Sequence, residues 1–121
     1  MQERRQSDRY PIAFPIRVKW KDEAGTVVTE EGLTENVGIQ GALIYLPRKL
    51  PTVGCKVELT VTENANDEVK VSAEVIRLER NAAHPQVALS LRDGVRAWKK
   101  KVWAHAGDRI AAERPDEADD W

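Results

Sequence analysis

The sequence is poor in the residues that build metal centres and covalent cross-links. It has a single cysteine, Cys55, and two histidines, His84 and His105. One cysteine excludes an intramolecular disulfide, and this set of ligands is too small for a structural zinc site. Cys55 alternates with the apolar residues that follow it, so we interpret it as a small residue of the core. We therefore predict neither a bound metal nor a cofactor.

The sequence also lacks the motifs of common enzyme classes. No serine or cysteine stands in a nucleophile elbow, and no phosphate-binding glycine loop precedes a predicted helix. Neither histidine has an evident carboxylate partner, since His84 precedes Pro85 in a loop and His105 lies in a predicted helix. We therefore expect a protein that is not an enzyme.

No hydrophobic run is long enough to cross a membrane. The longest, Ala42 to Leu46, falls far short of the roughly 20 apolar residues that a transmembrane helix needs. The N-terminal residues are polar and arginine-rich, with no apolar stretch after them. We predict no membrane insertion and a reducing, cytoplasmic setting.

Neither sign of charge dominates. The chain of 121 residues carries 19 lysines and arginines against 20 aspartates and glutamates, and this net charge of −1 argues against a general nucleic-acid binder. The charges are nevertheless segregated, with Arg4, Arg5 and Arg9 near one end, lysines at 99–101, and an acidic stretch at 116–120. Any anion site must therefore be local. The length indicates one domain with its own hydrophobic core.

Apolar residues alternate with polar ones along most of the chain, which is the pattern of strands with one buried face. Beyond Val75 the alternation shifts by one residue to Ile76 and Leu78, which indicates a β-bulge. The sequence predicts six short strands with hairpin-length connections, and thus an antiparallel β-barrel or sandwich. The predicted strands span residues 14–20, 26–33, 41–46, 55–62, 69–78 and 87–91.

After residue 92 the apolar spacing becomes helical, because Val95, Trp98 and Val102 recur at intervals of three and four residues. Asp93 is the predicted N-cap, and Gly107 is expected to end or weaken the helix. We predict a flexible, arginine-rich arm at residues 1–10, a barrel at 11–92, a helix at 93–112 and a disordered acidic tail at 113–121.

Two short motifs stand out against this background. The first is R-R-Q-S-D-R at Arg4 to Arg9, and the second is N-V-G-I-Q-G at Asn36 to Gly41. Taken singly, the first is typical of a solvated charged arm, and the second of a hairpin turn whose asparagine and glycines tolerate positive φ. Taken together and in this order, they resemble the signature of the PilZ domain, RxxxR followed by [D/N]xSxxG. Gly38 stands where that signature has serine.

The resemblance extends over roughly residues 4–101, because G-A-L-I-Y-L, A-E-V-I-R-L and V-A-L-S-L are similar to the hydrophobic pattern of the family. It implies a mainly all-β fold, a six-stranded antiparallel β-barrel of PilZ type with a C-terminal α-helix. It also implies a receptor for the bacterial second messenger cyclic di-GMP that signals to an unidentified downstream protein.

By this resemblance, the guanidinium groups of Arg5 and Arg9 hold the phosphates and guanine edges of the ligand. Asp8 orients an arginine or meets a guanine N–H. Arg4, an additional arginine before the motif, favours two intercalated cyclic di-GMP molecules over one, with a solubilising charge as the alternative. The arm is expected to fold over the barrel when the ligand supplies counter-charge.

The second motif supplies the other side of the expected site. By the same resemblance, Asn36 binds a guanine edge, and Gly41 permits the turn and lets the ligand come close to the backbone. Gly38 lacks the hydroxyl of the family serine, so its backbone N–H is the group that remains to donate.

Two other functions stay open. A degenerate PilZ-like adaptor keeps the fold without binding cyclic di-GMP; Gly38 favours this alternative, and the intact arginine pair disfavours it. An oligonucleotide-binding barrel needs outward aromatic residues on its sheet. Phe14 and Trp20 share an apolar face and are most simply core, which leaves Tyr45 as the one strand aromatic expected to point outward.

Overall fold

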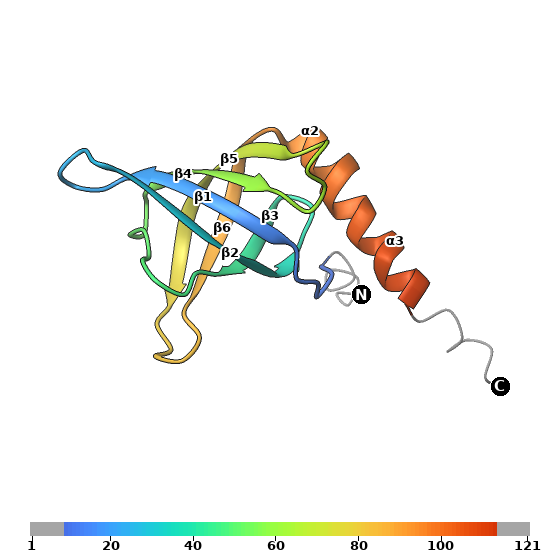
Figure 1. Cartoon of the computed structure of the whole chain (residues 1–121), viewed down its shortest axis with the longest axis horizontal. Coiled ribbons are helices and arrows are strands. Elements are labelled where there is room, and N and C mark those ends of the chain that lie inside the picture. The colour runs from blue at the N-terminus through green and yellow to red at the C-terminus, as the bar shows by residue number, and fades with distance from the viewer. Residues whose placement is uncertain (1–8, 114–121) are drawn as a thin grey trace, which may run out of the picture.

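The computed structural model describes residues 9–113 of the chain, in which a small β-barrel carries a helical segment beside one end (Figure 1). Six antiparallel strands close the barrel in the order β1-β2-β3-β6-β5-β4. The predicted fold, a six-stranded antiparallel barrel followed by a helix, is confirmed. The strands are β1 (Pro15–Lys21), β2 (Val27–Val37), β3 (Gly41–Tyr45), β4 (Lys56–Val61), β5 (Val69–Glu79) and β6 (Gln86–Asp93).

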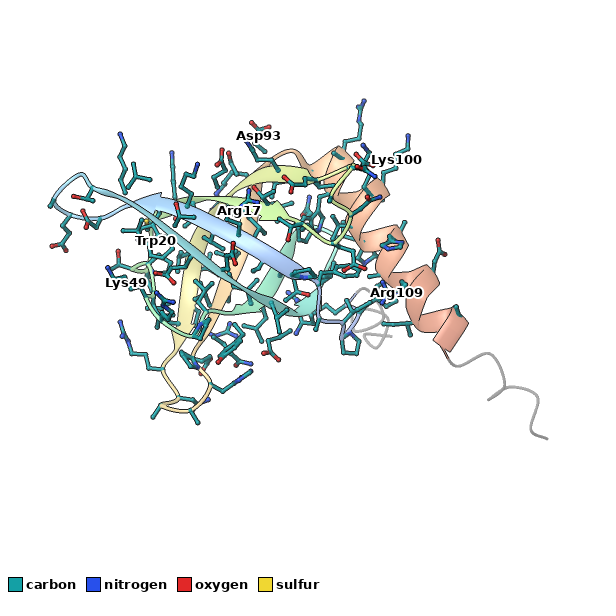
Figure 2. The ribbon with its side chains drawn as sticks, in the orientation of Figure 1. Arg17, Trp20, Lys49, Asp93, Lys100 and Arg109 are labelled. Atoms are coloured by element: carbon teal, nitrogen blue, oxygen red, sulfur yellow. The ribbon has the colours of Figure 1, made fainter. Side chains whose placement is uncertain are left out.

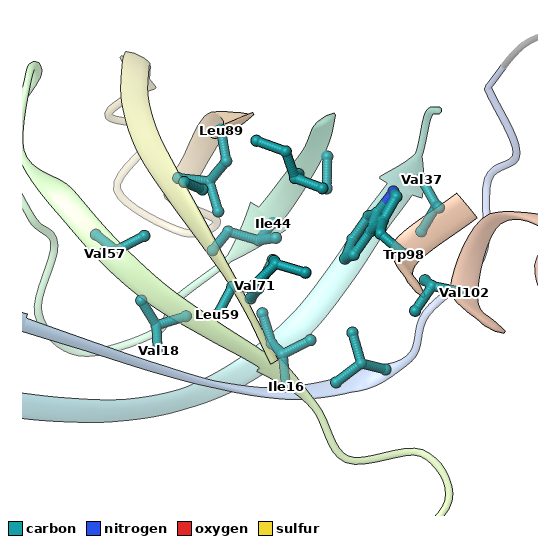
Figure 3. Packing of buried hydrophobic residues seen from close by; sticks show 14 of the residues in the cluster. Ile16, Val18, Val37, Ile44, Val57, Leu59, Val71, Leu89, Trp98 and Val102 are labelled. Carbon is teal, nitrogen blue, oxygen red and sulfur yellow. The ribbon is translucent and has the colours of Figure 1, made fainter. Parts of the chain in front are cut away.

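The core fills the barrel because each strand turns alternate side chains inward. Ile16, Val18 and Trp20 of β1 are at most 6% exposed, as the alternation predicted. Inward-facing side chains of the other strands meet them in the middle of the barrel (Figure 3). Cys55 departs from the prediction, because it lies just before β4 and is only partly buried at the edge of the core.

Bulges interrupt the regular pairing of the strands. The predicted bulge in β5 is confirmed, since the β5–β6 register shifts between Val75 and Arg77 and leaves Ile76 50% exposed. Another bulge, which the sequence did not predict, lies in β2, where the register shifts between Thr34 and Asn36. Strand β2 continues beyond its predicted end at residue 33 and, after the bulge, includes Asn36 and Val37 of the second motif.

The helical segment begins later than predicted. Asp93 is not its N-cap but the last residue of β6, and Gly94 takes that place with a φ of 78°. Glycine adopts this left-handed conformation without the steric cost that a side chain brings. The Asp93 carboxylate instead accepts a hydrogen bond of 2.9 Å from the Gly94 N–H.

A π-helical turn keeps one face of the helical segment against the barrel. Trp98, Val102 and Ala106 face the barrel and are at most 1% exposed. They are spaced by four residues, and an α-helix of about 3.6 residues per turn rotates such a series gradually out of line. The π turn takes more residues per turn and so offsets this rotation. The segment consists of α2 (Val95–Trp98), the π turn η1 (Lys99–Trp103) and α3 (Ala104–Glu113).

Gly107 does not end the helix, contrary to the prediction, because α3 continues to Glu113. A side chain at this position would begin 3.0 Å from ring atoms of Tyr10. The glycine therefore provides the space in which the Tyr10 ring packs against α3.

No helix within residues 9–113 is long and apolar enough to cross a membrane. Within the same residues, no three histidine, cysteine or carboxylate side chains gather closely enough to hold a metal ion. Residues 1–8 of the predicted arm and residues 114–121 of the predicted tail lie outside the described residues.

Candidate functional site

Tyr10 fixes the chain where it leaves the arginine-rich arm. Its N–H donates to the Val37 carbonyl, and its carbonyl accepts from the Val37 N–H, both at 2.9 Å. The centre of its ring lies 5.5 Å from that of Trp103, and the same ring packs against Gly107 of α3. Arg9, the residue before it, is therefore held beside the end of β2, where the second motif begins.

Arg9 and Asn36, 27 residues apart in the sequence, meet in the structure, because the Arg9 Nη1 donates a hydrogen bond of 2.5 Å to the Asn36 Oδ1. The side chain passes over Gly38, since its Cγ and Cζ lie 3.5 Å from the position that a Cβ on Gly38 would take. Arg9 is exposed and has no carboxylate partner among the described residues. Its charge and its remaining donors are therefore available to an anion.

The bulge in β2 sets the direction of Asn36. Strict alternation would turn Asn36 into the barrel on the side of Thr34, which is 2% exposed. Because Glu35 is the extra residue of the bulge, Asn36 instead pairs with Leu43 on the outer face of the sheet. Leu43 in turn pairs with Ala88 of β6. Asn36 therefore stands next to Leu43, which is half-buried on the outside of the barrel.

Gly38 has a fixed backbone but room for a side chain. Its N–H donates to the Gly41 carbonyl, and its carbonyl accepts from the Trp98 Nε1, both at 2.8 Å. A Cβ would come no closer than 3.5 Å to its surroundings, which is ordinary van der Waals contact. The fold therefore does not require glycine here. The expectation that the Gly38 N–H remains free to donate to a ligand is wrong, because the Gly41 carbonyl already accepts it.

Gly41 has a structural role that the sequence did not predict, while its role in letting a ligand approach stays a prediction. Positive φ occurs, within the described residues, only at Gly25, Gly54 and Gly94, so the motif does not use the positive-φ turn expected of its asparagine and glycines. A Cβ on Gly41 would lie 2.5 Å from the Leu89 carbonyl oxygen of β6. Only a residue without a side chain lets β3 begin so close to β6.

Trp98 fastens the helical segment to the motif. Its ring is fully buried in the core, on the side of Val37 and Val102 (Figure 3). Its Nε1–H is the donor that satisfies the Gly38 carbonyl. The turn that carries Gly38 is therefore held by α2 as well as by the sheet.

A second outward cluster lies beside Asn36. The Glu35 carboxylate binds the His84 Nε2, and the His84 ring stacks on Tyr45 at 4.2 Å with an angle of 8°. Tyr45 is on the outer face, as predicted, but it is covered by His84. Glu35 is the carboxylate partner of a histidine that the sequence did not reveal, since 49 residues separate the two.

Arg4, Arg5 and Asp8 lie outside the described residues, and their predicted roles stay predictions. The predicted site residues that are described, from Arg9 and from the second motif, all lie at the end of the barrel beside the helical segment.

Sequence reasoning missed the residues that hold these elements together, namely Tyr10, Trp98 and Gly107. Tyr10 gave a weak signal as the first aromatic residue after a polar arm. The helical spacing placed Trp98 on the apolar face of the predicted helix, but nothing in that spacing indicated a hydrogen bond to the motif. Gly107 suggested a helix end, because its partner Tyr10 is distant in the sequence.

Comparison with known proteins agrees with this architecture. The model of the PilZ domain family matches residues 3–99. The fold is similar to that of the PilZ domain with c-di-GMP of YcgR from Escherichia coli, with a TM-score of 0.67 and 13% identity, covering 90% of this chain and 95% of that one. No curated protein matches the chain.

Two longer proteins contain a similar barrel. The Bacillus subtilis inhibitor of motility MotI/DgrA has a TM-score of 0.65 and 13% identity, covering 88% of this chain and 50% of that one. The K. pneumonia MrkH–c-di-GMP complex has a TM-score of 0.59 and 11% identity, covering 88% of this chain and 52% of that one. The chain thus spans about half the length of these two proteins. At these identities the likeness is one of fold, whereas the family model matches most of the sequence itself, and the chain therefore belongs to the PilZ domain family.

Proposed function

We propose that this chain is a receptor that binds cyclic di-GMP between its arginine-rich arm and the turn from Asn36 to Gly41. The contact between Arg9 and Asn36 carries the proposal, because it brings the two family motifs to one place on the barrel. Membership of the PilZ family supports the identity of the ligand, since structures of this family include complexes with c-di-GMP.

The polar groups of the site suit the two phosphates and two guanines of this ligand. The planar guanidinium of Arg9 can form two parallel hydrogen bonds to a phosphate or to the O6 and N7 atoms of guanine. Asn36 accepts from Arg9 with its Oδ1 and keeps its amide N–H groups for an acceptor on the guanine edge. Leu43 beside it, half-buried on the outer face, offers apolar surface to the face of a base. In the proposal, Arg4, Arg5 and Asp8 complete the clamp from the arm.

Ligand binding orders the arm in this proposal. Arg4, Arg5 and Arg9 repel one another when they gather at one site, and an anionic ligand between them removes that repulsion. Tyr10 and Trp98 fasten the end of the arm and the turn to the helical segment. The surface at this end of the barrel therefore changes on binding, and a downstream protein reads it. Backbone amide relaxation of residues 1–8 tests this step, and equal mobility with and without cyclic di-GMP contradicts it.

Gly38 supports a second candidate function, an adaptor that keeps the PilZ fold without binding cyclic di-GMP. The residue lacks the hydroxyl of the family serine, and its N–H is already bonded within the turn. A folded wild-type protein that gives no heat with cyclic di-GMP would support this alternative.

Calorimetric titration with cyclic di-GMP separates the two functions. We expect binding by the wild type and a loss of at least about tenfold in affinity for Arg5→Ala, Arg9→Ala and Asn36→Ala, because hydrogen bonds to charged groups contribute about 1.5–3 kcal/mol. Arg96→Ala is the matched control, since this exposed arginine of α2 has no partner among the described residues. Equal losses in the control and in Arg9→Ala contradict the proposed site. A stoichiometry of two ligands per chain supports the intercalated dimer.

A further inference from the structure

The barrel opens at the end opposite the motif, between β1 and β4. The two strands pair only from Ile16 opposite Val61 to Lys19 opposite Glu58. Beyond this point β1 continues to Lys21 along β2, whereas β4 begins at residue 56 along β5. The strand ends therefore part and leave short unpaired edges, a feature that other chains can use for pairing.

Two adjoining cavities occupy this opening and share Trp20, Lys21 and Cys55 in their walls. Their volumes are about 780 and 490 Å³, within the range of about 300–1,000 Å³ that is typical of binding pockets. Core residues form the floor, among them Val57, and Val27 at the rim is 54% exposed. We refer to the larger cavity as the β1–β4 groove. Figure 2 shows Trp20 at this end of the barrel, with Lys100 and Arg109 at the other.

Lysines without partners surround the β1–β4 groove. Lys19, Lys21 and Lys56 line it, and none of them has a carboxylate partner within residues 9–113. Among its acidic residues, Glu58 lies 3.8 Å from the Lys70 Nζ, and Asp93 accepts the Gly94 N–H but keeps its negative charge. Arg92 is paired with Glu74, so three lysines stand against one carboxylate that has no cationic partner among the described residues. Asp22 and Glu23 line the smaller cavity next to the groove. The groove thus combines an apolar floor with a positive rim, which fits an acidic segment that carries an aromatic side chain.

The chain contains such a segment beyond α3. Residues 116–121 read D-E-A-D-D-W, with four carboxylates and one indole. The indole suits the apolar floor and the carboxylates suit the lysine rim, because tryptophan provides much apolar area for an interface. Residue 113, where α3 ends, lies far from the end of β1 and the start of β4, which border the groove (Figure 1). This distance favours the groove of a second copy over the groove of the same chain.

We propose that the β1–β4 groove binds residues 114–121 of a second copy of this chain. The contact is heterologous, because the groove of one copy meets the tail of the next, and it therefore leads to rings or open chains rather than a symmetric pair. The interface is small, so we expect weak association with a dissociation constant between about 1 µM and 1 mM. The cyclic di-GMP site lies at the other end of the barrel and does not take part.

A fluorescein-labelled peptide with the sequence of residues 114–121, titrated with the full chain and followed by anisotropy, tests the proposal. We expect saturable binding that weakens with added salt and falls at least about tenfold for Lys19→Glu/Lys56→Glu, because the double change reverses the charge of the rim. Lys99→Glu/Lys100→Glu is the control of equal charge on the helical segment and should leave binding unchanged. Replacing Trp121 of the peptide by alanine should also weaken binding.

A charge exchange makes the test specific. A peptide with Asp119→Lys and Asp120→Lys should bind the Lys19→Glu/Lys56→Glu protein better than it binds the wild type. Sedimentation velocity of the full chain should show association that rises with concentration and that the Lys19→Glu/Lys56→Glu variant loses. The proposal is overturned by absence of peptide binding to the folded wild type, by equal loss in the control variant, or by association that persists in the groove variant.

Discussion

The two ends of the barrel differ in how completely their groups are paired. At the motif end, Trp98 fills the space under the helical segment and bonds to the Gly38 carbonyl, and Thr34 bonds to the Phe14 N–H at 2.8 Å. At the other end β1 and β4 part, and lysines line the opening without partners among the described residues. The motif end is therefore held in a fixed shape, which suits the proposed ligand site, whereas the open end exposes charge and apolar surface.

The largest expected effect compares one tryptophan from each end. Trp98→Ala should lower the free energy of unfolding by about 3–5 kcal/mol, because the residue is fully buried and its loss leaves an enclosed cavity and an unpaired carbonyl. Trp20→Ala should cost less, because Trp20 lines the β1–β4 groove and solvent can occupy the space that it leaves. Urea denaturation of both variants measures the difference, and equal losses would remove the contrast between the ends.

The next prediction compares the two glycines of the motif. Gly41→Ala should destabilise the fold by about 1–3 kcal/mol, because its Cβ would lie 2.5 Å from the Leu89 carbonyl oxygen and strand β3 would have to move. Gly38→Ala should change stability by less than about 0.5 kcal/mol, because its Cβ would make only ordinary contacts. Urea denaturation of the two variants measures the difference between their free energies of unfolding. A Gly38→Ala variant as unstable as Gly41→Ala would contradict the geometry of the turn.

Gly38→Ser should strengthen ligand binding if the site binds cyclic di-GMP. The hydroxyl restores the family residue, and a hydrogen bond contributes about 0.5–1.5 kcal/mol, which corresponds to an affinity up to about tenfold higher. Gly38→Ala provides the control, since it adds the same Cβ without the hydroxyl. Titration calorimetry measures the affinities, and an equal effect of serine and alanine would show that the hydroxyl is not used.

The smallest expected effect concerns the packing of the Tyr10 ring against Gly107 of α3. Replacement of glycine by alanine within a helix usually stabilises the helix by about 0.8–1.0 kcal/mol. Gly107→Ala should lack this gain, because its Cβ would lie 3.0 Å from the Tyr10 ring. The gain should return in a Tyr10→Ala background, and a double-mutant cycle by urea denaturation measures the difference. The same gain in both backgrounds would mean that the ring does not occupy this space.

Much of the barrel followed from the sequence because the inward residues of several strands alternate regularly with outward ones. In β1 and β4 the alternation places the strands to within one residue at each end. In β2 it fails, because most of the strand is exposed or half-buried on both faces and its register then shifts at Glu35. The direction of Asn36 depends on that shift, so the outward site could not be derived from the local pattern.

The contacts that complete the candidate site are long-range, which is why the sequence did not reveal them. Trp98 bonds to a carbonyl 60 residues away, and His84 binds a carboxylate 49 residues away. The N-cap was predicted at Asp93 because aspartate is common there, but the backbone bends at the glycine that follows. Arg9 and Asn36 were nevertheless identified correctly as neighbours, since the order and spacing of the two motifs are a family pattern rather than a local preference.

The most direct measurement is a pair of ¹H–¹⁵N correlation spectra of the full chain, recorded without and with saturating cyclic di-GMP. The account predicts that the amide signals of Val37 and Gly38 and the indole N–H signal of Trp98 shift, because these groups surround the Arg9–Asn36 contact. The signals of Lys21 and Lys56 at the β1–β4 groove should stay in place. Shifts confined to the groove, or no shifts at all in the folded protein, would contradict a ligand site at the motif end.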